Sequence, residues 1–124
     1  MVYQLIGPDD KKLPRCDKHL HLPLREVAAY IKGAQRHICG VTGLMHVASG
    51  VGTKSIVIYG GRELPNMTGY SNNINIQSNP PCAPCWIVPN CPYGFSKNGR
   101  FHKPCLEMIT PEMVWEQLKA DLIL

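Results

Sequence analysis

The sequence has no long hydrophobic run. Hydrophobic residues make up 44% of its 124 positions, yet no apolar stretch approaches the roughly eighteen residues that a helix needs to span a bilayer. The opening stretch "MVYQLIGPDD" is too short and too soon acidic for a signal peptide. We therefore expect a cytoplasmic protein with no membrane span.

The sequence also has no dominant charge and no internal repeat. Its 13 Lys and Arg residues against 9 Asp and Glu residues give a formal net charge of +4. This charge is too small to imply nucleic acid by itself. A chain of this length fits one domain, which buries about two thirds of its unfolded surface. The composition thus predicts one soluble domain with a core of its own.

A complete phosphate-binding loop is missing too. The stretch "HVASGVGTKS" (46–55) has the glycines, lysine and serine of such a loop, but Ala48 and Thr53 occupy the two positions that require glycine. An apolar run, "KSIVIYGG", follows it, whereas a phosphate loop opens a helix. We therefore interpret Gly50 and Gly52 as the end of a helix.

What is present is an alternation of short strands and helices. Apolar runs predict strands at 2–6, 18–22, 36–41, 54–61 and 74–77. Helices are expected from Pro23 to Gly33, over 42–52, and after Thr110, which is placed as an N-cap. This order indicates an α/β domain in which helices flank a parallel sheet.

Prolines and cysteines gather in one stretch. "NPPCAPCWIVPNCPYG" (79–94) has too many prolines for a long helix or a central strand, so we expect a shaped loop. Two, five and thirteen residues separate four cysteines in and after it: Cys82, Cys85, Cys91 and Cys105. A two-residue gap in a turn lets both sulfurs face one ion, and two further thiolates complete a tetrahedron.

We predict that these four thiols bind a structural metal ion. Zinc is the default for four thiolates, and iron binds the same geometry. Four protein ligands leave no open position for a substrate, so the role is structural. Two disulfides, which a cytoplasmic location disfavours, and four unconnected thiols are the alternatives. Cys39 stands apart and is interpreted as a buried strand residue.

A basic turn lies between the third and fourth of these cysteines. "SKNGRFHK" (96–103) has an Asn-Gly turn signal and several basic side chains. A solvated loop is the simpler interpretation. A surface that faces phosphate or RNA is the alternative, with Trp86, Tyr93 and Phe101 as stacking faces. No nucleic-acid motif accompanies them, so we do not expect a nucleic-acid partner.

The helix expected at 42–52 begins where a ligand can bind. Thr42 is placed to cap it. The N–H groups of Gly43, Leu44 and Met45 would point out of the carboxyl edge of the sheet. A helix start favours an anion through its dipole, and His46, one turn further, would add a donor. A plain capped helix is the alternative.

Two charged residues follow the strand expected at 54–61. Arg62 and Glu63 would lie at the same edge of the sheet as Thr42. They are interpreted either as contacts to a nucleotide or sugar, or as an ordinary surface pair.

The stretch "ICGVTGLMHVASGVGTKSIVIYGGRELP" (38–65) resembles the donor-binding half of glycosyltransferase family 9, the heptosyltransferase-like enzymes. Their hallmark is Asp, Ser or Thr, Gly, two variable residues and His, then a small-residue helix and a strand that ends in glycine. "LPLREVAAYIKGA" (22–34) and "PCLEMITPEMVWEQL" (104–118) resemble neighbouring family helices.

The resemblance implies a Rossmann-like donor half-domain of the GT-B type. In the family this helix start holds the diphosphate of a nucleotide sugar, here an ADP-heptose-like donor bound at 42–46. Similar cysteine clusters occur in parts of the family, and in related autotransporter heptosyltransferases a four-cysteine finger holds iron.

The sequence departs from the family in two respects. Val41 stands where the family has its aspartate, which removes a polar contact to the donor. Family enzymes carry the acceptor site and the catalytic base in an N-terminal half that these residues lack. No catalytic residue is therefore assigned, and we expect the isolated chain to be weak or inactive.

The strand that would come first in this half-domain is also missing from these residues. It is central in a sheet ordered 3-2-1-4-5-6, so its loss leaves a gap. We therefore predict self-association or a partner chain that completes the sheet.

These observations together predict one partial donor-binding domain. It consists of an α/β core (1–78), a cysteine-rich loop (79–106) and a C-terminal helix (107–124). The predicted function is glycosyl transfer from a nucleotide-diphosphate sugar. The alternative is a metal-stabilised interaction module that keeps the fold without sugar chemistry.

Overall fold

The centre of the fold is a three-stranded parallel sheet. The computed structural model describes residues 1–86 and 91–122. Its central sheet has the order β3-β4-β5, formed by His37–Gly40, Ser55–Tyr59 and Ile74–Gln77. In this register Ile38, Ile56 and Ile74 lie side by side in one row. These strands confirm three of the predicted ones.

Two smaller sheets accompany it. β1 (Tyr3–Leu5) and β2 (Lys18–Leu20) pair in parallel, and β6 (Phe95–Lys97) and β7 (Arg100–His102) form an antiparallel hairpin. Asn98 and Gly99 connect the hairpin with φ values of 53° and 72°. A two-residue turn of this kind requires positive φ at both positions, so the Asn-Gly turn signal is confirmed.

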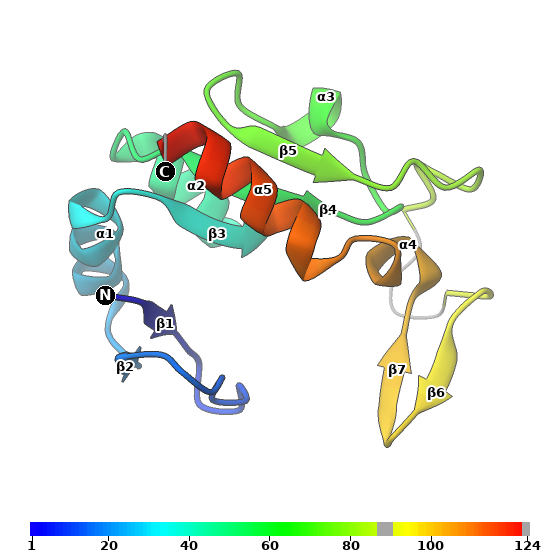
Figure 1. Ribbon diagram of the computed structural model, residues 1–124, viewed down its shortest axis with the longest axis horizontal. Coiled ribbons are helices and arrows are strands. Elements are labelled where there is room, and N and C mark those ends of the chain that lie inside the picture. Colours follow the sequence, from blue (N-terminus) through cyan, green and yellow to red (C-terminus); the bar gives the residue numbers. More distant parts are fainter. Residues whose placement is uncertain (87–90, 123–124) are drawn as a thin grey trace.

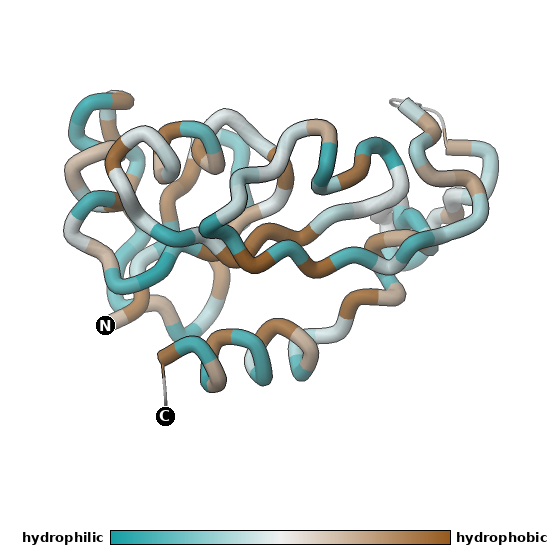
Figure 2. The backbone as a smooth tube through the Cα atoms, turned by 90° about the horizontal axis from the view of Figure 1, so that it is seen from above, coloured by the Kyte–Doolittle hydropathy of each residue, from teal (hydrophilic) through white to brown (hydrophobic). Residues whose placement is uncertain are grey.

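Helices cover both faces of the central sheet. The longer ones are α1 (Leu24–Gly33), α2 (Gly43–Gly50) and α5 (Pro111–Leu122), and α3 (Pro65–Thr68) and α4 (Pro104–Glu107) are single turns. α5 lies along one face of the sheet, and α2 packs on the opposite face (Figure 1, Figure 2). Within the described residues, no helix is long and apolar enough to cross a membrane.

The helix boundaries follow the sequence signals. α2 ends at Gly50, and Gly52 has a φ of +82° that side chains rarely adopt. α5 begins at Pro111, and the Thr110 Oγ1 accepts a hydrogen bond from the backbone N–H of Met113 at 3.3 Å. The glycine stop and the threonine cap are therefore confirmed.

The core consists of two apolar clusters on the α2 side. Met45, Val57 and Tyr59 are fully buried and pack together beneath α2. The second cluster joins α1 and α2 and includes Leu5 of β1, which packs against Val27, Ile31 and Ala48. β1 is thus held to the rest of the fold by the helices.

Ion pairs fix the other face. The Asp121 carboxylate at the end of α5 accepts hydrogen bonds from Arg36 Nε and, at 2.7 Å, from Lys54 Nζ. Arg36 directly precedes β3, and Lys54 directly precedes β4. These contacts hold the pKa of Asp121 below its ordinary value, with the Lys54 hydrogen bond as the main cause.

The parallel strands are interrupted where the sequence predicted a gap. β1 and β2 form a sheet of their own and share no ladder with β3 in the described residues. This is the place of the central strand that, according to the family resemblance, these residues lack. Completion of the sheet by another copy or a partner chain stays a prediction.

Candidate functional site

The start of α2 is open to solvent. Thr42 has the extended backbone of an N-cap, with φ −140° and ψ 172°, but its side chain makes no capping hydrogen bond. The prediction of a side-chain cap is therefore wrong. A β-carbon added at Gly43 would meet no atom within 4 Å, so the backbone there is freely approachable. A helix start without a side-chain cap leaves its N–H groups for water or an anion.

The two following side chains anchor this helix start. Met45 is fully buried, and the Tyr59 hydroxyl donates to its sulfur at 3.8 Å. Leu44 packs against the cluster shared by α1 and α2. The Met45 N–H already donates to the Thr42 carbonyl at 3.1 Å. The ligand-binding role predicted for these two residues therefore stays a prediction.

His46 forms a pair that the sequence did not predict. Its Nδ1 lies 2.7 Å from the Tyr70 hydroxyl, and the two rings meet edge to face with centroids 5.6 Å apart. Tyr70 follows α3 and fixes the imidazole ring on the exposed side of α2. The residues are 24 positions apart, and no local pattern links them.

A cavity of about 320 Å³ lies beside the helix start. Its lining includes Leu44 of α2, the Ile6–Gly7 segment after β1, and His21 and Leu22 after β2. Because parallel strands end at this edge of the sheet, the cavity lies where open α/β sheets bind ligands. Asp10 and His21 are its polar side chains with ionisable groups. Neither residue was predicted from the sequence, because β1 and β2 were not expected to border a cavity.

Arg62 and Glu63 do not line that cavity. They follow β4 at the predicted sheet edge, with Arg62 exposed and Glu63 half-buried. The Arg62 carbonyl accepts a hydrogen bond from the backbone N–H of Trp86 at 3.0 Å. The described contacts leave their role in ligand binding a prediction.

The predicted cysteine site is not assembled in the described residues. All four cysteines are free thiols, with Cys82 exposed and the others half-buried. Two of them meet the Gly60–Gly61 segment. The Cys85 N–H donates to the Gly61 carbonyl at 2.9 Å, and the Cys105 sulfur lies 3.3 Å from a β-carbon added at Gly60. Over 1–86 and 91–122, no three Cys, His, Asp or Glu side chains converge on a metal position.

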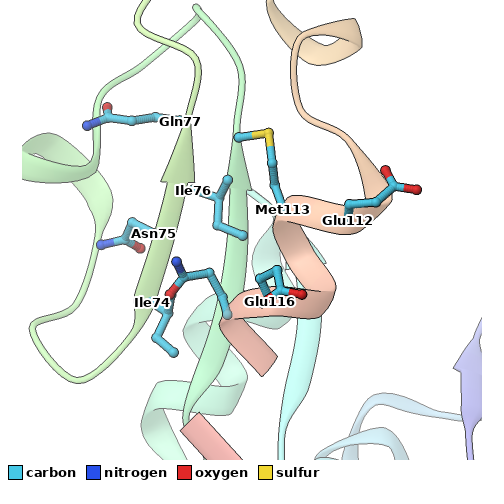
Figure 3. Close-up of a pocket in the computed structure, with 8 residues that line it drawn as sticks. Ile74, Asn75, Ile76, Gln77, Glu112, Met113 and Glu116 are labelled. Carbon is cyan, nitrogen blue, oxygen red and sulfur yellow. The ribbon is translucent and has the colours of Figure 1, made fainter. Parts of the chain in front are cut away.

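A second cavity, of about 580 Å³, contains none of the predicted site residues. It lies between β5 and α5, where Ile74, Ile76 and Met113 form its apolar part and Glu112 and Glu116 belong to its α5 side (Figure 3). Its two carboxylates disfavour a phosphate, whereas the start of α2 borders the other cavity. The cavity beside α2 therefore remains the candidate site.

The comparison with protein families decides the class. The profile of glycosyltransferase family 9 (heptosyltransferase) matches residues 20–91, which is more than half of the chain. The chain belongs to glycosyltransferase family 9. The match includes the α2 start and the cavity wall from His21 to Leu44. Searches of the curated proteins and of the solved structures found no significant match.

Proposed function

We propose that this family 9 domain binds the diphosphate of a nucleotide-sugar donor at the start of α2. The observation that supports it is the open backbone at Thr42 and Gly43 beside the cavity of about 320 Å³. The uncapped N–H groups carry the positive end of the helix dipole, which stabilises an anion. The cavity would receive part of the nucleoside or the sugar. Membership of family 9 leads us to expect an ADP-heptose-like donor.

His46 would add a hydrogen-bond donor to this site. Tyr70 occupies its Nδ1, which leaves Nε2 as the nitrogen for a phosphate or sugar oxygen. The contact with Tyr70 also limits rotation of the ring, so less side-chain entropy is lost on binding.

Calorimetric titration with ADP, UDP, GDP and their common sugar conjugates tests the proposal. Gly43→Ala adds a methyl group at the helix start where there is open space, so the fold tolerates it while the anion is pushed from the backbone. We expect its affinity for the best ligand to fall about tenfold or more, the loss of one charge-assisted hydrogen bond.

Gly50→Ala is the matched control. Gly50 lies at the other end of the same helix, and a β-carbon there also meets nothing within 4 Å. Both changes should preserve or slightly raise the helix stability, but only Gly43→Ala should weaken binding. Thr42→Val and His46→Ala should weaken it too, whereas His102→Ala in the distant hairpin should not.

The same titration separates the two functions that the sequence left open. Saturable binding that Gly43→Ala weakens supports a donor site for glycosyl transfer, with the acceptor half supplied elsewhere. If none of the nucleotides binds to the folded protein, the donor proposal fails. The metal-stabilised interaction module would then be the better interpretation, and Val41 in place of the family's aspartate favours it.

A further inference from the structure

The side chain of His46 lies over the start of α2. Thr42 is the N-cap and Gly43 the first helical residue, so His46 belongs to the next turn on the same side of the helix. Helical side chains lean toward the N-terminus of their helix. The exposed imidazole of His46 therefore stands beside the backbone N–H groups to which the proposed function assigns the diphosphate.

Tyr70 meets this imidazole from a different part of the chain. Its hydroxyl lies 2.7 Å from His46 Nδ1, and the two rings meet edge to face. The Tyr70 ring also packs against the buried cluster of Met45, Val57 and Tyr59. One end of this tyrosine is thus embedded in the core, and the other end contacts the histidine.

The segment on either side of Tyr70 packs closely. The Gly69 N–H donates to the Pro65 carbonyl at 2.7 Å, and the Asn73 N–H donates to the Tyr70 carbonyl at 3.1 Å. A β-carbon at Gly69 would lie 2.5 Å from the Pro65 carbonyl oxygen and 3.2 Å from the Tyr59 hydroxyl, so only glycine fits there. This packing fixes the place of the Tyr70 hydroxyl beside α2.

The chemistry of this contact selects one tautomer of His46. A neutral imidazole carries its proton on one ring nitrogen and accepts a hydrogen bond at the other. Within the described residues, His46 Nδ1 is the one hydrogen-bond partner of the Tyr70 hydroxyl. When the hydroxyl donates, its proton and the Nδ1 lone pair are both satisfied, whereas the reverse arrangement leaves the phenolic proton without a protein acceptor. The N–H of His46 is therefore on Nε2, across the ring from Tyr70.

His19 provides the opposite case in the same molecule. Its Nδ1 lies 2.7 Å from Gln4 Oε1. Two backbone groups fix the orientation of the Gln4 amide, since Oε1 accepts from the Leu13 N–H and Nε2 donates to the Lys11 carbonyl, both at 2.8 Å. An amide oxygen can only accept, so neutral His19 carries its proton on Nδ1. The two histidines thus have opposite tautomers because their partners differ.

We propose that Tyr70 is a positioning residue that fixes the proton of His46 on Nε2 and so presents this N–H to a phosphate oxygen of the donor. The proposal rests on the proposed function and narrows it from a phosphate or sugar oxygen to a phosphate. A phosphate oxygen has no proton to give and requires a donor at Nε2, whereas a sugar hydroxyl can bind either tautomer. A fixed Nε2–H therefore favours the diphosphate in particular.

The tautomer is measured first, without any nucleotide, from the NMR chemical shifts of the histidine ring nitrogens at pH 8. Tyr70→Phe keeps the ring and removes only the hydroxyl. In wild type, we expect the two His46 nitrogens to have the widely separated shifts of one tautomer with the proton on Nε2, and His19 to show the reverse. In Tyr70→Phe, the two His46 shifts should approach each other, because both tautomers become populated, while those of His19 stay unchanged. Tyr30→Phe, at a tyrosine of α1 that is 40% exposed, is the matched control and should change neither histidine. A proton on Nδ1 of His46 in wild type, or equal His46 shifts in wild type and Tyr70→Phe, overturns the proposal.

Calorimetric titration with ADP, UDP, GDP and their glucose conjugates then tests the phosphate contact. Tyr70→Phe should weaken the best diphosphate and its conjugate alike, by about three- to tenfold, which corresponds to one hydrogen bond. Tyr30→Phe should bind both as wild type does. Unchanged affinity in Tyr70→Phe, or a loss confined to the sugar conjugate, overturns the phosphate contact. If no nucleotide binds to wild type, the donor site fails and the phosphate contact with it, whereas the ring-nitrogen shifts still decide whether Tyr70 fixes the tautomer of His46.

Discussion

The central sheet and the cysteine region of this family 9 domain are held together in different ways. Met45, Ile56, Val57 and Tyr59 in and beneath the sheet are all 0% exposed. None of the residues 78–86, 91–99 and 102–110 is buried. That region is tied to the segment that follows β4 by backbone contacts, such as the hydrogen bond from the Cys85 N–H to the Gly61 carbonyl at 2.9 Å.

The difference shows what each region needs in order to be ordered. A fully buried apolar side chain contributes about 1.5–3 kcal/mol to folding, so the sheet is stabilised by its own packing. A segment without buried side chains lacks that contribution and must offset its chain entropy by other means. The cysteine spacing predicts that metal ligation is that means.

The largest expected effect concerns the predicted metal. If the four thiolates bind one ion, the apparent binding energy is about 10–16 kcal/mol, which far exceeds the effect of a single core residue. Cys85→Ser should abolish stoichiometric zinc or iron in the purified protein and increase amide exchange over residues 91–107. Elemental analysis and exchange measure the two effects.

Cys16→Ser is the control for the metal prediction, because Cys16 lies outside the cysteine-rich loop. It should leave the metal content unchanged. The wild-type protein is grown and purified with both metals supplied and without chelators. The prediction is wrong if this protein contains neither zinc nor iron.

The second effect concerns the core beneath α2. Met45→Ala removes a fully buried side chain from contact with Val57 and Tyr59. It should lower the free energy of unfolding by about 2–5 kcal/mol, because the surrounding side chains close the cavity only in part. Urea denaturation measures it. Met67→Ala, at a methionine that is 48% exposed, should change stability by less than about 0.5 kcal/mol. Equal effects would mean that α2 is not part of the core.

The third effect is the pH dependence of the contact between α5 and the sheet. The pKa of Asp121 is lowered from 3.8, first by Lys54 and then by Arg36. A carboxylate whose pKa is lower in the folded state than in the unfolded state stabilises the fold at pH values above the unfolded pKa. That stabilisation is lost as the pH falls through the folded pKa. Wild type should therefore melt at a higher temperature than Asp121→Asn at pH 6, and the difference should vanish near pH 2.

Glu116→Gln provides the matched control on the same helix. Glu116 pairs with Lys119 three residues later, and its side chain is 63% exposed. Exposed pairs of this kind contribute little, so its melting temperature should follow that of wild type at both pH values. If Asp121→Asn also follows wild type at pH 6, the ion pairs do not hold α5 to the sheet.

Local features of the fold were predictable from the sequence. Gly50 ends α2, Thr110 caps α5, and Asn98–Gly99 turns the hairpin, because each signal acts on its own backbone or on residues within one turn. The apolar run of β4 is likewise recognisable by itself, since a strand covered on both faces reads as continuous.

Contacts between distant segments were not predictable in the same way. Asp121 meets Arg36 across 85 residues and Lys54 across 67. Tyr70 positions His46, although neither carries a mark of the other in the sequence. The separation of β1 from β3 was expected only through the family resemblance, because strand patterns do not encode which edges pair. The start of α2 was found in advance because its signal is local; the cavity beside it was not.

The smallest effect compares thiols of the two regions. Burial raises the pKa of Cys39 in β3 to about 11, against an opposing hydrogen bond from Ser55. At pH 8 its thiolate fraction in the folded protein should be roughly two hundredfold lower than in the denatured chain, where a thiol titrates at about 8.5. Alkylation by iodoacetamide, followed by mass spectrometry of the metal-free protein, should slow accordingly. Cys82 is exposed and should react at similar rates in both states. Rapid alkylation of Cys39 in the folded protein would mean that the open edge of β3 exposes the interior as well as its backbone.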